Sequence, residues 1–176
     1  MYNFNEAYKE STIGDSIVPY GSWNTVPVAI SIDSYNLPLV AGNVIPGKYT
    51  TMLPCIYREV VSIELVHAII PIPNANSPYV SLKINGLSRV ESNNNNTRGS
   101  FCVLYQDNQG DTHFRFKRVG STPDDKYIYY FPEPVKLNKF DIEILTPDGA
   151  ICNGANDTNH HVLTFEVKCL NRAVKE

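Results

Sequence analysis

Apolar residues alternate with polar residues along most of this 176-residue chain. The alternation is clear where Val61, Ile63 and Leu65 are separated by Ser62 and Glu64. A period of two places successive side chains on opposite faces of a β-strand, so that one face meets a core. No stretch of 12 residues has a good helical period, and prolines and glycines fall at the ends of the runs. The pattern therefore predicts an antiparallel all-β fold.

The alternating runs can be counted as strands. A leading run at 28–33 precedes eight more. These eight predicted strands span approximately 48–53, 59–71, 79–90, 100–106, 112–118, 127–131, 139–145 and 161–169. Eight strands in two sheets is the number found in a jelly roll. We therefore predict one domain, residues 23–176, folded as a single eight-stranded antiparallel jelly roll (a β-sandwich or barrel).

Residues 1–22 have a different character. They are polar, dotted with tyrosine and phenylalanine, and interrupted by Gly14, Pro19 and Gly21. We expect an extended N-terminal arm that lies on a surface and takes no part in the core. Large amphipathic rings are enriched at protein interfaces, so aromatic residues in such an arm are candidate contacts with another subunit. The candidates are Tyr2, Phe4, Tyr8, Tyr20 and Trp23.

Composition excludes several classes of function. A net charge of −3 argues against general affinity for phosphate backbones, so we expect no specific nucleic-acid partner. No apolar run approaches the roughly 18–20 residues that span a bilayer, which predicts no transmembrane segment. The first ten residues resemble no secretory signal, so synthesis in a cytoplasm is expected.

Signatures of catalysis and of cofactor binding are missing from the sequence. Two metal-binding histidines on one strand need a spacing of two, whereas His160 and His161 are adjacent. There is no G-x-S-x-G or S-x-x-K motif, and no glycine-rich phosphate loop. We therefore predict no enzyme activity, no catalytic residue, no metal and no cofactor. Asp33 and Ser34 are interpreted as residues that cap a strand and hydrogen-bond the following turn.

The cysteines and one basic strand also have structural interpretations. The four cysteines form no C-x-x-C motif, and we expect free, mostly buried thiols at Cys55, Cys102, Cys152 and Cys169. Basic and aromatic residues alternate in 114–118, a pattern that would suit stacking on single-stranded nucleic acid. In a strand, however, the two kinds of side chain lie on opposite faces. The phenylalanines are therefore expected in the core and the basic residues outside it.

Three long polar connections are expected at one end of the jelly roll. They are predicted at about 91–99, 119–126 and 146–160. Loops at the end of a rigid scaffold commonly carry its contacting surface.

Two parts of the chain carry a family resemblance. The first contains Ile32-Asp33-Ser34, then Pro46-Gly47-Lys48-Tyr49-Thr50, and then the strand at 59–71 that ends in Pro71. The second runs through 127–132 (Y-I-Y-Y-F-P), 135–142, Pro147-Asp148-Gly149 and the last strand at 163–167. In order and spacing these motifs resemble single jelly-roll vertex (penton) and minor capsid proteins of large double-stranded DNA viruses, of the nucleocytoplasmic large DNA virus type.

The resemblance implies a structural role in a virion. Five copies would form a homopentamer around each icosahedral vertex and contact the major capsid protein and other minor capsid proteins. The expected location is the capsid vertex. Two alternatives remain open: another minor capsid position, and a β-sandwich module that binds a glycan or a protein. The second would be supported by a compact pocket of aromatic residues and carboxylates at the end with the long loops.

Overall fold

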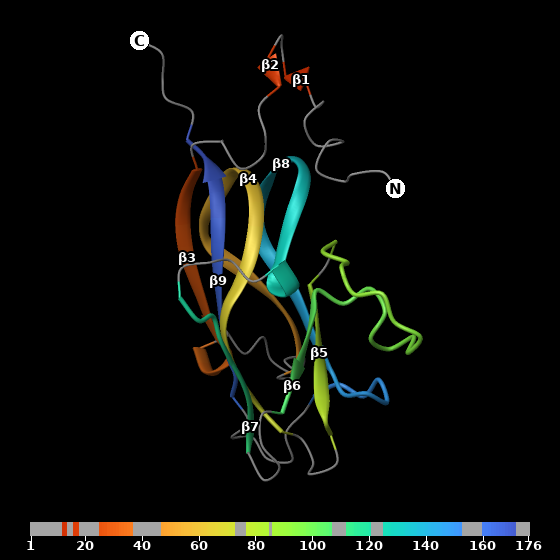
Figure 1. The fold of residues 1–176 in the computed structure, drawn as a ribbon. Coiled ribbons are helices and arrows are strands. Elements are labelled where there is room, and N and C mark those ends of the chain that lie inside the picture. The colour runs from red at the N-terminus through yellow and green to blue at the C-terminus, as the bar shows by residue number, and fades with distance from the viewer. Residues whose placement is uncertain are drawn as a thin grey trace.

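The computed structural model describes residues 12–13, 16–17, 25–36, 47–72, 77–84, 86–106, 112–120, 125–152 and 160–171. Its strands are β1 (Thr12–Ile13), β2 (Ser16–Ile17), β3 (Thr25–Asp33), β4 (Lys48–Pro71), β5 (Tyr79–Ile84), β6 (Cys102–Tyr105), β7 (His113–Lys117), β8 (Ile128–Leu145) and β9 (Val162–Leu170) (Figure 1). Two short 3-10 helices, η3 (Ser34–Asn36) and η4 (Asp125–Tyr127), complete the described elements. These residues contain no α-helix, so the all-β prediction is confirmed for them.

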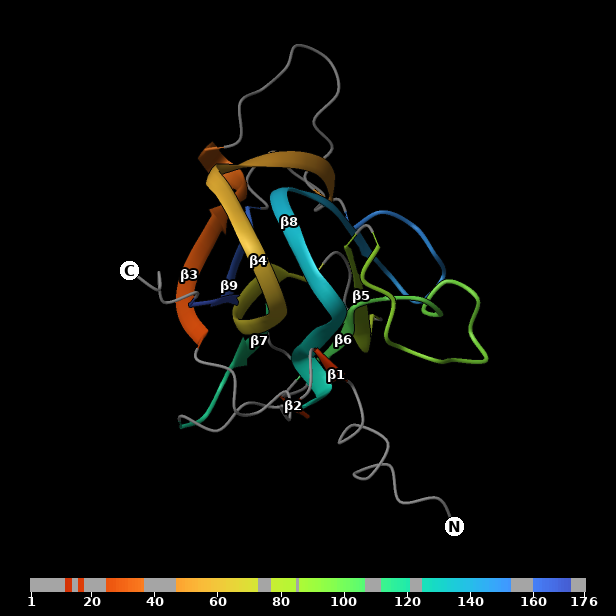
Figure 2. The same cartoon turned by 90° about the horizontal axis from the view of Figure 1, so that it is seen from above.

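Seven of the strands form one antiparallel sheet. Its hydrogen-bonded order is β3-β9-β4-β8-β5-β6, and β7 pairs with β4 beside this path. The sheet curls into a half-barrel, as the view in Figure 2 shows. The remaining pair, β1 and β2, forms a two-stranded antiparallel ladder of its own.

The main sheet has seven strands, so the predicted eight-stranded jelly roll is not confirmed, because several predicted strands are continuous. The runs at 48–53 and 59–71 are both parts of β4, and those at 127–131 and 139–145 are both parts of β8. Pro54 and Pro132 were expected to separate strands, because proline cannot donate a ladder hydrogen bond. β4 instead continues through register shifts between Met52 and Ser62. Such bulges bend a strand without ending it.

One predicted strand is shorter than expected. The run at 79–90 ends as β5 at Ile84, where the amide of Leu87 donates to the Ile84 carbonyl in a turn containing Gly86. Gly86 has a φ of 78°, a conformation that glycine adopts without a Cβ clash. Residues 87–100 then form a long connection to β6. The other predicted runs lie within three residues of observed strand ends.

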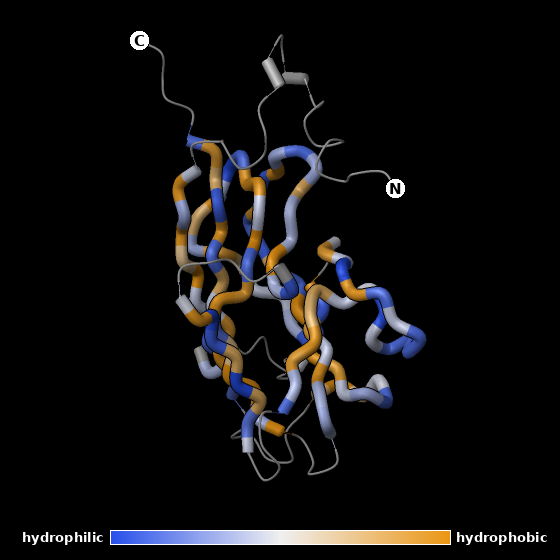
Figure 3. Tube along the Cα trace, viewed as in Figure 1, coloured by the Kyte–Doolittle hydropathy of each residue, from blue (hydrophilic) through white to orange (hydrophobic). Residues whose placement is uncertain are grey.

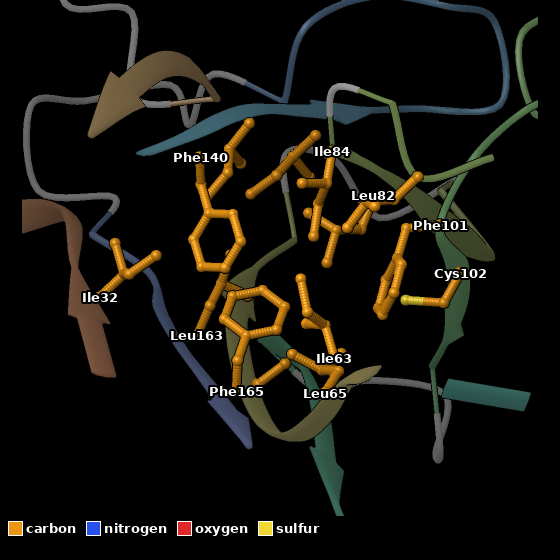
Figure 4. Close-up of a cluster of buried hydrophobic side chains, with 14 of the residues drawn as sticks. Ile32, Ile63, Leu65, Leu82, Ile84, Phe101, Cys102, Phe140, Leu163 and Phe165 are labelled. Carbon is orange, nitrogen blue, oxygen red and sulfur yellow. The ribbon is translucent and has the colours of Figure 1, made fainter. Parts of the chain in front are cut away.

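The core lies inside the curl of the sheet. Phe101, Phe140 and Phe165 are fully buried and meet there, with ring centroids of Phe165 at 6.2 Å from Phe101 and 5.1 Å from Phe140 (Figure 4). Removing such side chains from water stabilises the fold by about 2–3 kcal/mol each. Figure 3 shows the hydrophobic and hydrophilic residues alternating along the strands, as the sequence predicted.

Candidate functional site

The predicted contact residues of the arm lie outside the described part of the chain. This applies to Tyr2, Phe4, Tyr8, Tyr20 and Trp23, so their role stays a prediction. Among the described residues, polar, charged and aromatic side chains gather in three places. These are a buried tyrosine–histidine pair, a partly buried ion-pair network, and a hollow on the surface lined by two cations.

The tyrosine–histidine pair joins the beginnings of two strands. The hydroxyl of Tyr49 lies 2.6 Å from Nε2 of His161, and the two rings stack with centroids 5.4 Å apart. Tyr49 is the second residue of β4, and His161 directly precedes β9. Both side chains are buried. Burial lowers the pKa of His161 to about 4 and raises the pKa of Tyr49, so both side chains stay neutral near pH 7.

The end of β3 completes this cluster. The amide of Tyr35 donates to Oδ1 of Asp33 at 3.0 Å, which confirms the predicted role of Asp33 in the turn. Ser34 instead reaches across to His161: its Oγ accepts from the His161 amide at 2.8 Å, and its own amide donates to the His161 carbonyl at 3.0 Å. The cluster therefore ties together β3, β4 and β9. Because Ser34, Tyr49 and His161 are buried, their hydrogen bonds act as a structural brace in this conformation.

The ion-pair network is centred on Arg118, the residue after β7. Its guanidinium lies 2.9 Å from Oε2 of Glu64 and 3.1 Å from Oε2 of Glu166. The two glutamates are paired across β4 and β9, and Glu64 is 1% exposed. Hydrogen bonds to Glu166 and then Glu64 raise the pKa of Arg118. Arg118 thus pairs with both of the carboxylates that the strand register places opposite each other, and Lys168 lies 3.9 Å from Oε1 of Glu166.

The faces of the basic strand agree with the prediction. Phe114 is fully buried and Phe116 packs against the core, whereas Arg115 and Lys117 are exposed. Arg118 was expected on the outer face as well. In the structure Arg118 forms ion pairs with Glu64 and Glu166, and the local sequence pattern does not reveal these partners.

The histidines and cysteines described by the structure are scattered. Among these residues no group of three potential ligands from His, Cys, Asp and Glu gathers into a possible metal site. The four cysteines are free, as predicted, but only half of them are buried: Cys102 and Cys152 are buried, Cys169 is intermediate and Cys55 is exposed. No helix in the described ranges has the length and apolar character needed to cross a membrane.

Two of the predicted surface loops lie against each other. The side-chain amide of Asn94 donates to the Pro147 carbonyl at 2.9 Å and to the hydroxyl of Tyr79 at 3.0 Å. The amide of Asn96 also reaches the Pro147 carbonyl, at 3.3 Å. The predicted proximity of 91–99 and 146–160 is therefore confirmed for the described part of the second loop. The third loop includes residues 121–124, which lie outside the described ranges.

A shallow, open hollow of about 260 Å³ lies beside β6. Arg89 and Lys126 supply positive charge, and Tyr105 and Tyr127 supply aromatic surface. Val90 and Val103 complete the lining. The described residues of this lining are basic, aromatic and aliphatic. Its chemistry fits an acidic or aromatic segment of a protein partner.

The sequence alone did not predict the contacts that form the tyrosine–histidine pair, the ion-pair network or the hollow. Tyr127 was noted for its aromatic strand, and His161 was considered as a metal ligand. Their partners come from distant segments, and the pairing depends on strand register. The polar positions of Glu64 and Glu166 within alternating runs were visible signals, but no local pattern links them to Arg118.

Compared with known proteins, the chain matches no protein-family model and no curated protein.

Proposed function

We propose that this chain is a virion structural protein, a penton-type capsomer that forms a pentamer at icosahedral vertices and contacts the major capsid protein. Its place is the capsid vertex, after synthesis in the host cytoplasm. The family resemblance of its motifs motivates the proposal, and the order of strand pairing is the observation that supports it best.

A jelly roll has eight strands, and its two sheets have the orders 1-8-3-6 and 2-7-4-5. Most of the observed pairs follow these orders if β4 is counted as two strands that meet at its bulges; the pairing of Ser62–Glu64 in β4 with Ile128–Tyr130 in β8 lies outside them. The first sheet is then β3, β9, the second half of β4, and β7. The second is the first half of β4, the second half of β8, β5 and β6. We infer a jelly roll in which β3 is strand one.

This assignment changes the strand order expected from the sequence. The run at 28–33 was placed before the jelly roll, but here it provides the first strand. The predicted runs at 127–131 and 139–145 were separate strands, and here they are the two parts of strand seven. In this scheme the roll uses all seven strands of the main sheet.

A capsomer acts through shape and contact, so oligomeric state is the direct test of the proposal. We expect native mass spectrometry of the full-length chain to reveal a species of five times the chain mass. Imaging of the particle should place the same chain at the five-fold vertices. Two results together would contradict the proposal. The isolated chain would stay monomeric at high concentration, and the vertices of the particle would contain another protein.

A further inference from the structure

Two of the cysteines lie near each other where β9 ends beside the bend of β4 (Figure 1). Cys169, near the end of β9, is opposite Val60 of β4 in the antiparallel ladder. The side chains of Cys169 and Tyr57 both pack against the hydrophobic core. Cys55 precedes Tyr57 by two residues, a spacing that places both side chains on the same face of a strand. Strand register and strand period therefore bring Cys55, Tyr57 and Cys169 to one place.

The three side chains influence one another. A hydrogen bond with Cys55 is the main cause that raises the pKa of Tyr57, and the charge of Cys169 contributes to the rise. Burial raises the pKa of Cys169, and the charge of Cys55 raises it further. Exposed charges act on each other in this way over distances of up to about 10 Å in ordinary salt. Cys55 and Cys169 are therefore close neighbours, although 'free' thiols in this structure.

The bend of β4 can adjust to a covalent link. Its ladder with β8 shifts register between Met52 and Tyr57 and again between Tyr57 and Val60. Glu59, inside the second shift, has a φ of 57°, in the left-handed region that residues with a side chain rarely adopt. A disulfide needs Cα atoms about 4.4–6.8 Å apart, and a segment between register shifts moves to such a separation more readily than a regular ladder.

We propose that Cys55 and Cys169 form a reversible disulfide that fastens the bend of β4 to the end of β9 under oxidising conditions. The structure shows both thiols in the reduced form. The oxidant is a low-molecular-weight disulfide such as glutathione disulfide. This inference goes beyond the proposed function, because the link lies within one chain and does not depend on the number of copies in an assembly.

The exposures of the two thiols set the order of the reaction. Cys55 is exposed, so its thiolate attacks one sulfur of glutathione disulfide; a mixed disulfide forms and one glutathione thiolate leaves. The negative charge of Cys55 is then lost, which removes one of the causes that keep Cys169 protonated. The Cys169 thiolate attacks the Cys55 sulfur and releases the second glutathione. Two cysteine thiols are oxidised, one glutathione disulfide is reduced, and the two protons pass through water to the two glutathione thiolates.

Oxidation of the full-length chain tests the link. The reduced protein, dilute and at about pH 8 so that thiolates form, is incubated with glutathione disulfide. The remaining thiols are blocked with N-ethylmaleimide, and the peptides are mapped by mass spectrometry. We expect the loss of two of the four thiols and one pair of peptides joined through Cys55 and Cys169. On a non-reducing denaturing gel the product should run as a single chain.

Two serine variants give the matched comparison. Cys55→Ser changes an exposed side chain and should abolish the joined peptides without unfolding the protein. Cys152→Ser changes a buried thiol outside the pair, and its hydroxyl can keep the hydrogen bond to the Pro71 carbonyl. This variant should yield the same joined peptides as the original chain. When the original chain is oxidised in urea, the share of this pairing should fall several-fold, because the fold no longer holds the two thiols together.

The link should also hold the fold together. A disulfide that closes a loop of about 110 residues restricts the unfolded chain, so oxidation should raise the urea concentration at the midpoint of unfolding. Hydrogen exchange of the amides in 53–59 should slow at the same time. Neither change is expected in Cys55→Ser, which cannot form the link.

Several outcomes would overturn the disulfide. Four unreacted thiols after the incubation, or glutathione that stays attached to Cys55, would show that Cys169 does not reach the mixed disulfide. A covalent dimer joined through Cys55 of two copies would show that the exposed thiol pairs between chains. An equal yield of the joined peptides in urea would show that the fold does not select this pair. Each result leaves the pentamer of the proposed function to its own test by native mass.

Discussion

The hydroxyl of Tyr49 lies 2.6 Å from Nε2 of His161, and this contact joins residues that are 112 positions apart in the chain. His161 is 2% exposed and its backbone is paired with Ser34 in both directions. The imidazole therefore has little access to water when the protein is folded. A proton on this ring has to be accommodated without the hydration that it would have in the unfolded chain.

Acid should destabilise the fold through His161. Its folded-state pKa is about 4, against an ordinary value of 6.5, because burial outweighs the attraction of Asp33 and His160 adds to the lowering. Between these values the unfolded chain binds more protons, so stability is complete above about pH 6.5 and falls as the pH drops towards 4. The loss from this group approaches about 3 kcal/mol.

Urea unfolding at several pH values measures this effect. The variant His161→Gln should have a flatter pH profile between 6.5 and 4, even if its stability at pH 7 is lower. His67→Gln is the matched control, because this side chain is not buried and is not among the groups that shift the pKa of His161, so the variant should keep the slope of the original protein. Equal slopes in all three proteins would contradict the assignment.

Loss of Arg118 should leave two carboxylates without their shared cation. Glu64 is nearly inaccessible to water, so Arg118→Met is expected to lower the free energy of unfolding by about 3 kcal/mol. The double variant Arg118→Met with Glu64→Gln should recover much of this loss, because the buried charge is gone. Denaturant titration of the single and double variants measures both values.

An exposed ion pair provides the comparison for Arg118. Lys48 and Glu143 form a pair at 2.5 Å, but their side chains are 56% and 35% exposed. Lys48→Met should therefore change stability by less than about 1 kcal/mol. If Arg118→Met costs no more than Lys48→Met, the partly buried network around Arg118 contributes little to the fold.

The strands were predictable because their signal is local. Alternation along 161–169 or 112–118 needs no knowledge of the partner strand, and both runs appear as strands within one residue of each predicted end. The continuity of β4 was not predictable in this way. Pro54 was interpreted as a break, whereas bulges allow the strand to bend and to change its pairing partners along its length.

The sites depend on register, which the chain encodes through packing and not through neighbouring residues. Glu64 meets Glu166 because β4 and β9 pair at that position, and Arg118 reaches both from the end of β7. A shift of one residue would turn each side chain to the other face of the sheet. His161 is buried and hydrogen-bonded to Tyr49. The spacing of His160 and His161, which was used to judge metal binding, does not predict that hydrogen bond.

Gly47 should not tolerate a side chain. A Cβ at this position would lie 2.6 Å from the Cys152 carbonyl oxygen and 2.8 Å from Cγ2 of Ile151. The Gly47 carbonyl also accepts from the Ile144 amide at 2.7 Å, so the backbone cannot move away freely. Gly47→Ala is expected to destabilise the protein by about 2 kcal/mol in thermal or denaturant unfolding.

A second glycine separates crowding from backbone strain. At Gly86 a Cβ would meet nothing within 4 Å, but the φ of 78° disfavours any residue with a side chain. Gly86→Ala should cost about 1 kcal/mol. A larger loss at Gly86 than at Gly47 would show that contact with Cys152 is not the dominant constraint.

The four thiols should react with alkylating reagents at very different rates. The thiolate is the reactive form, so both exposure and pKa matter. Cys55 is exposed and should be modified first. Cys169 should follow, because it is partly buried and burial raises its pKa. Cys102 and Cys152 are buried; burial raises both pKa values, that of Cys152 to about 11, so these two should react on unfolding.

Pulse alkylation at pH 8, followed by peptide mass spectrometry, resolves the four rates. The native protein should give a fast phase that belongs to one thiol, and Cys55→Ser should remove that phase without changing the rates of Cys102 and Cys152. Addition of denaturant should bring all thiols to a similar rate, since the unfolded chain no longer protects them. Rapid labelling of Cys102 in the native protein would contradict its place beside Phe101 and Leu82 in the core (Figure 4).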